Sequence, residues 1–125
     1  MRNLFACLLS LFIFCFSAMS QNNVTFQVDM NSVDPTTFTT PEVNGTFNGW
    51  CGNCAAMTDA DGDSVWQFST IFAPGDSLEW KYSADNWNIQ EDLDSALSCI
   101  TINYDPGAPN GWGFVNRLAV VNSDT

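Results

Sequence analysis

Apolar and polar residues alternate along several short stretches of the chain, and this period of two is typical of half-buried β-strands. The alternation is clearest over 24–30 and over 78–84, where every second residue is apolar. No stretch sustains a period of 3.6 residues, although 90–97 allows one helical turn. Further strands are predicted over 43–47, 65–72, 97–104 and 114–121.

Turn-forming residues separate these predicted strands. Pro74-Gly75-Asp76 ends the strand over 65–72, and a loop rich in Asn, Gly and Asp occupies 48–64,. Six or so short strands, each with one apolar face, predict an all-β fold of two packed antiparallel sheets. The pattern alone is also compatible with a barrel.

The first residues form an apolar run behind a basic start. Arg2 precedes an apolar segment over 4–16 that only Ser10 interrupts, and small residues follow it. The run is shorter than the roughly 20 residues that a membrane-spanning helix needs. Ala18 and Ser20 fit an A-x-A-like cleavage site,. We therefore expect 1–20 to be a signal peptide and 21–125 to be one domain, secreted to the extracellular space or the periplasm.

The chain is acidic, with 14 Asp and Glu against three Lys and Arg. Arg2 would leave with the signal peptide, so the domain keeps only Lys81 and Arg117. Nucleic acids and anionic membranes attract proteins through cation–phosphate contacts. Neither is therefore an expected partner of the exported domain. All five Trp residues lie in 21–125, which indicates a packed core rather than disorder,.

Three cysteines, Cys51, Cys54 and Cys99, lie outside the predicted signal peptide. Thiols of exported proteins are usually oxidised, and an odd number leaves one without an intramolecular partner. A bridge from Cys51 to Cys54, or from either of them to Cys99, is compatible with the sequence. The C-x-x-C segment lacks the βαβ context of a redox motif. The chain has no His to complete a zinc site,, so we expect a structural disulfide.

Residues 43–50 read Val-Asn-Gly-Thr-Phe-Asn-Gly-Trp. This segment is similar to the start of the glycogen- and starch-binding modules of the early-set β-sandwich type, as in the β subunit of AMP-activated kinase. The resemblance continues through 74–87, which contains Lys81, and through 113–117, which contains Asn116. Extracellular modules of Bacteroidetes look similar too, with a Trp-Cys-Gly-x-Cys loop and an Asp-x-Asp-Gly-Asp turn. The resemblance implies an immunoglobulin-like antiparallel β-sandwich of about 6–8 strands.

The resemblance also implies a binding site. In the glycogen-binding relatives two Trp side chains form a platform for glucosyl rings, and the matching positions are Trp50 and Trp87. The family's strand lysine matches Lys81 and its asparagine matches Asn116. A pyranose packs its apolar C–H face on an aromatic ring, while its hydroxyls need placed donors and acceptors. The implied function is non-catalytic binding of a polysaccharide or oligosaccharide, an α-glucan or another glucose polymer, by aromatic stacking.

Each Trp also has a structural interpretation, because buried aromatic residues are common in cores. Trp50 and Trp87 could cap the ends of the sandwich, and we expect Trp66 and Trp80 in the core. Trp112, between two glycines, fits either the core or an additional stacking position. For the whole domain, the alternative function is a structural or adhesion module of a larger cell-surface or secreted protein.

Asp59, Asp61 and Asp63 alternate around Gly62 like the first half of a calcium loop,. The second half does not match, since the twelfth position is Thr70 where such loops carry Glu,. The alternative is a hairpin turn in which Gly62 supplies the positive φ. We favour the turn, with weak calcium binding as the other interpretation and no other cofactor.

Paired carboxylates of the kind that glycoside hydrolases use cannot be singled out among the acidic residues. The chain offers no His base and no Ser–His arrangement,. We therefore expect no enzymatic activity in this domain, although a catalytic domain could belong to a longer parent protein. In the extracellular relatives further cysteines follow the last strand, which implies a partner for one cysteine beyond Thr125.

Overall fold

The computed structural model describes residues 20–104, 107 and 113–122. The described chain forms seven strands and one 3₁₀ turn. In order these are β1 (Asn22–Asp29), β2 (Pro41–Gly45), η1 (Thr46–Asn48), β3 (Val65–Phe72), β4 (Ser77–Ala84), β5 (Ile89–Gln90), β6 (Ile100–Asn103) and β7 (Phe114–Val120). Within this part of the chain no helix has the length and apolar character to cross a membrane.

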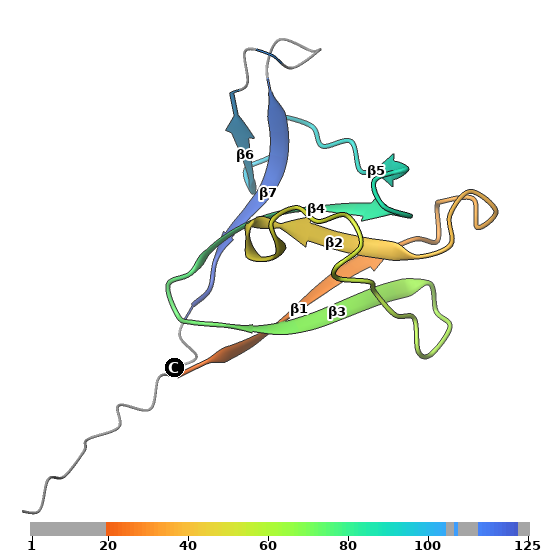
Figure 1. The fold of residues 1–125 in the computed structure, drawn as a ribbon, viewed down its shortest axis with the longest axis horizontal. Coiled ribbons are helices and arrows are strands. Elements are labelled where there is room, and N and C mark those ends of the chain that lie inside the picture. The colour runs from red at the N-terminus through yellow and green to blue at the C-terminus, as the bar shows by residue number, and fades with distance from the viewer. Residues whose placement is uncertain (1–19, 105–106, 108–112, 123–125) are drawn as a thin grey trace, which may run out of the picture.

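The strands form two antiparallel sheets that pack as a sandwich (Figure 1). One sheet contains β1 and β3, and the other has the order β2-β4-β7-β6, with β5 paired to the end of β4. Phe26 lies opposite Phe68 in the small sheet, and Asn44 lies opposite Lys81 in the large one. The all-β sandwich predicted from the strand pattern is therefore confirmed.

The core lies between the two sheets and is rich in aromatic rings. Phe26 is 4% exposed, and its ring centroid is 5.2 Å from that of Phe47 and 5.5 Å from that of Trp80. Trp66 and Trp80 are partly buried against this cluster, as the alternation predicted. Burial of these rings is the main stabilising contribution that holds the small sheet to the large one.

All six predicted strands form in the predicted order, with shifts at their ends, and β5 is a seventh strand that was not predicted. The strand expected over 43–47 begins at Pro41 and ends at Gly45, where the chain turns into η1. The prediction of a helical turn over 90–97 was wrong. Ile89–Gln90 instead forms β5, because it pairs back onto Ser83 and Ala84 of β4. The predicted signal peptide falls outside the described residues, apart from Ser20.

A half-buried ion pair holds β5 and the segment after it against β4 and β7. Arg117 Nη2 lies 2.6 Å from Glu91 Oε2, and Glu91 Oε1 accepts the backbone N–H of Tyr82 at 2.9 Å. The Arg117 guanidinium also lies over the Tyr82 ring, 5.4 Å from its centroid. Arg117 is thus paired on the inner face of the large sheet, whereas Lys81 lies on its outer face.

Ionisation of the Tyr82 hydroxyl makes the stability of the fold depend on pH in the alkaline range. Burial raises the pKa of Tyr82 above its ordinary value,. The unfolded state then loses the phenol proton first, so this stabilisation is present below about pH 10 and is lost as the pH rises further. We expect urea denaturation to show stability that falls as the pH rises above about 10, and a smaller fall in Tyr82→Phe. Equal falls in both proteins, compared in a Cys99→Ser background, would contradict this assignment.

Candidate functional site

The outer face of the large sheet carries a groove of about 680 Å³. Strand β4 supplies its floor, and the loops that follow β2 and β4 form one wall. The lining side chains are those of Thr46, Trp50, Glu79, Lys81, Trp87, Gln90, Asn103, Phe114 and Asn116. All four residues of the predicted site are among them.

Trp50 reaches the groove because the chain folds back sharply after β2. Asn48 Oδ1 accepts the Gly45 N–H at 2.9 Å, and Asn48 Nδ2 donates to the Val43 carbonyl at 3.0 Å. The Trp50 N–H donates to the Gly45 carbonyl, and Trp50 itself has a φ of 59°. A left-handed conformation at a bulky residue costs about 1–2 kcal/mol, so the surrounding bonds must impose it.

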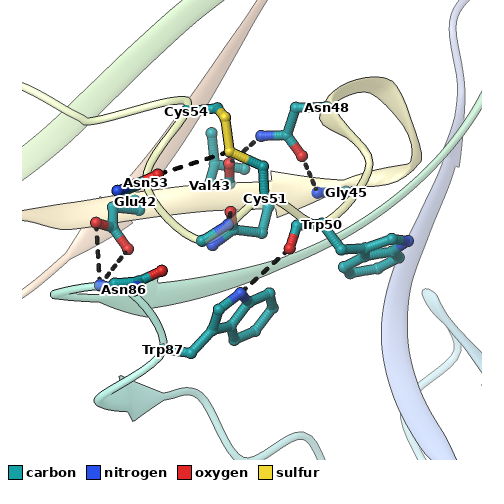
Figure 2. Close-up of a disulfide and its surroundings, with 12 residues drawn as sticks. Glu42, Val43, Gly45, Asn48, Trp50, Cys51, Asn53, Cys54, Asn86 and Trp87 are labelled. Atoms are coloured by element: carbon teal, nitrogen blue, oxygen red, sulfur yellow. Dashed lines mark hydrogen bonds between the residues drawn. A yellow bond between two sulfur atoms is a disulfide. The ribbon is translucent and has the colours of Figure 1, made fainter.

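A disulfide closes the loop directly after Trp50. Cys51 and Cys54 are bonded, with their Cα atoms 5.7 Å apart (Figure 2). The next residues run beside the free edge of β2, where Val43 N–H donates to the Ala55 carbonyl and Met57 N–H to the Pro41 carbonyl. Of the pairings that the sequence left open, the structure has Cys51–Cys54, which closes the loop next to Trp50.

Trp87 lies in the hairpin between β4 and β5. Asp85, Asn86 and Trp87 all have positive φ, at 52°, 59° and 67°. Two carboxylates hold this unusual turn. Asp85 accepts the N–H groups of Thr39 and Thr40 at 2.8 and 2.9 Å.

The second carboxylate belongs to Glu42, which is 4% exposed. It accepts the Asn86 N–H at 3.1 Å (Figure 2) and the Ser83 hydroxyl at 3.2 Å. Buried carboxylates cost free energy unless donors surround them, and here the donors come from the strand and the hairpin that present Trp87. Glu42 therefore helps to hold the hairpin in the conformation that presents Trp87 to the groove.

Asn44 joins the two loops through the interior of the site. Its Nδ2 donates to Ser83 Oγ at 2.7 Å, and its Oδ1 accepts the Gly52 N–H at 2.8 Å. Asn44 is fully buried, at 0% exposure. One buried amide thus ties the disulfide loop to the strand that leads into the Trp87 hairpin, and a fully satisfied network of this kind rigidifies its surroundings.

The two indole rings lie next to each other (Figure 2). Their centroids are 6.5 Å apart with 31° between the ring planes, and Trp87 Nε1 donates to the Trp50 carbonyl at 3.3 Å. Both residues are half-buried rather than enclosed in the core. The pair forms an aromatic surface at the groove, not a cap on the core of the sandwich.

Polar groups line the groove beside the indoles. Lys81 projects from β4, and the ion pair found among the described residues does not include it. Asn116 is 5% exposed, and its Nδ2 lies 3.4 Å from Glu79 Oε2. The groove therefore combines apolar rings with a cation, a carboxylate and amides.

The structure brings Trp50, Trp87, Lys81 and Asn116 together on one groove, whereas Trp112 lies outside the described residues. Sequence reasoning missed five other lining residues, namely Thr46, Glu79, Gln90, Asn103 and Phe114. A signal existed for two of them. Glu79 shares the polar face of its strand with Lys81, and Phe114 alternates in step with Asn116.

Asp59, Asp61 and Asp63 lie together in the loop before β3, each with an oxygen within 4.8 Å of the others. Asp59 uses both carboxylate oxygens on backbone donors, accepting from Gly62, Asp63 and Ser64 at 2.9 to 3.1 Å. Gly62 has a φ of 76°, as the turn interpretation predicted. The expected weak calcium site stays a prediction.

Cys99 is exposed and unbonded in the turn before β6. It is the cysteine without an intramolecular partner that the odd number predicts, since Cys51 and Cys54 pair with each other.

No protein-family model matches the chain, and none of the curated proteins matches it. The likeness to glycogen- and starch-binding modules therefore rests on the motifs themselves.

Proposed function

We propose that this domain is a secreted, non-catalytic carbohydrate-binding module for an α-glucan or another glucose polymer. One observation carries the proposal. The groove places Trp50 and Trp87 side by side, with ring centroids 6.5 Å apart, and adds Lys81 and Asn116 beside them. Two independent loops, both with residues in strained left-handed conformations, are held in place to present this pair,.

The chemistry of the groove suits a sugar better than an apolar ligand. Indole rings match the C–H face of a pyranose, and the charged and amide groups supply donors and acceptors for its hydroxyls. The disulfide and the Glu42 and Asn44 hydrogen bonds hold the rings before any ligand arrives. Such preorganisation lowers the entropic cost of binding. A single open groove should bind in the micromolar to millimolar range, and several copies would raise the avidity.

Affinity electrophoresis through amylopectin, laminarin and a non-glucan control tests the proposal. Covering about 60 Å² of each indole would contribute about 1.5 kcal/mol, so Trp50→Ala and Trp87→Ala should each weaken retention about tenfold. Trp66→Phe, a change at the edge of the core, is the control and should leave retention intact. Absence of retardation on every glucan, or retardation that survives both alanine changes together, would disprove sugar binding at this groove.

A structural or adhesion role is the second candidate, and the outer face of β7 favours it. Phe114, Leu118 and Val120 are 57%, 37% and 56% exposed along one side of this strand. Exposed apolar rows of this kind are found at protein contacts. A module that ignores all glycans but associates through β7 would support this role, and Leu118→Lys would abolish that association.

A further inference from the structure

The groove carries a carboxylate beside its aromatic pair. Glu79 lies two residues before Lys81 on the same face of β4, and both line the groove. Asn103 Nδ2 donates to Glu79 Oε2 at 2.7 Å, and Asn116 Nδ2 approaches the same oxygen at 3.4 Å. These amides orient the carboxylate without neutralising it, and the ion pair of the described residues does not involve Glu79.

Glu79 and Lys81 divide the hydrogen-bonding roles in the groove. A carboxylate only accepts hydrogen bonds, and an ammonium group only donates them. Among the described residues both donors to Glu79 reach Oε2, so Oε1 has no donor there. A neutral hydroxyl can donate to Glu79 and accept from Lys81. A sulfate or carboxylate group has no proton to donate and brings a second negative charge toward Glu79.

We propose that Glu79 is a specificity-determining residue that restricts the groove to neutral glycans and excludes polymers bearing uronate or sulfate groups. The inference rests on the proposed sugar-binding function. Two like charges about 8 Å apart, at an effective dielectric constant of about 30, weaken binding about tenfold relative to an uncharged residue at position 79, with Lys81 present in both cases. The acidic excess of the chain, 14 Asp and Glu against three Lys and Arg, acts in the same direction,.

The test compares a neutral glucan with its partially carboxymethylated derivative of the same chain length, by titration calorimetry at low and high salt. The wild-type domain should bind the derivative about tenfold more weakly at low salt, and less so at high salt. Glu79→Gln keeps the size of the side chain and removes its charge. It should bring the derivative to within about threefold of the neutral glucan. The neutral glucan itself should bind about fivefold more weakly, because its hydroxyl exchanges a charged acceptor for a neutral one. Asp61→Asn removes the same charge outside the groove and should keep the wild-type discrimination.

Two contrary results are distinguishable. If Glu79→Gln still binds the neutral glucan and discriminates as the wild type does, the inference is wrong and the proposed function stands. If neither protein binds the neutral glucan, the proposed function fails and the inference fails with it. If Glu79→Gln still binds the neutral glucan and binds the derivative almost as well, while Asp61→Asn discriminates as the wild type does, the result supports both.

Discussion

Phe26→Ala should lower the free energy of unfolding by about 3–5 kcal/mol, which is comparable to the whole stability of a small domain. Phe26 is 4% exposed and contacts rings on three other elements. Its centroid lies 5.2 Å from that of Phe47 on η1, 5.5 Å from that of Trp80 on β4 and 6.2 Å from that of Phe72 on β3. Removing it opens a cavity where the small sheet meets the large one.

The effect should be this large because, among the residues that the structure describes, the small sheet consists of β1 and β3. A two-stranded sheet is marginal by itself and depends on the surface that it packs against. Urea denaturation followed by Trp fluorescence measures the loss. Gln27→Ala, an exposed change on the same strand, should stay within about 0.5 kcal/mol of the wild type.

If Phe26→Ala does not fold, Phe26→Leu keeps most of the side-chain volume and should cost about 1–1.5 kcal/mol. A loss below about 1 kcal/mol in Phe26→Ala itself would show that the ring cluster does not hold the sheets together. The two sheets would then depend mainly on their connecting segments.

The strands could be predicted because each has a strong local pattern. The alternation over 24–30 predicted most of β1. Pro74-Gly75-Asp76 predicted the end of β3, where Asp76 Oδ2 accepts the Ala73 N–H. Strand β5 could not be predicted in this way. Its two residues form a strand only because they pair with the end of β4, and the neighbouring residues carry no period of their own.

The candidate site was harder to predict, because its supporting residues are polar and buried. Glu42 and Asn44 look like ordinary strand residues in the sequence, yet they are 4% and 0% exposed. They are covered because the chain after the disulfide returns along β2, through the hydrogen bonds of Ala55 and Met57. A contact made by residues far along the chain leaves no local signal. The motif could indicate both Trp positions, but only the pairing of β2 with β4 explains why the two rings meet.

Gly52→Ala should disrupt the groove, because the added methyl group meets the hairpin that carries Trp87. Gly52 has a φ of 82°, and a Cβ there would lie 2.3 Å from Asn86 Oδ1 and 2.8 Å from Trp87 Cδ1. The disulfide loop and the Trp87 hairpin touch at this point, so one of them must move. Because Cys51–Cys54 holds the first loop, we expect the hairpin to shift and Trp87 to leave its place beside Trp50.

Gly49→Ala is a control that separates backbone strain from steric clash, the two effects expected in Gly52→Ala. Gly49 also has a positive φ, 62°, but a Cβ there would meet nothing within 4 Å. Both changes should cost about 1 kcal/mol of backbone strain. Only Gly52→Ala should add the steric clash, for a total loss of about 2–3 kcal/mol, and lower glucan affinity at least about tenfold. Equal glucan affinity in the two variants would show that the contact between Gly52 and Trp87 does not position the ring.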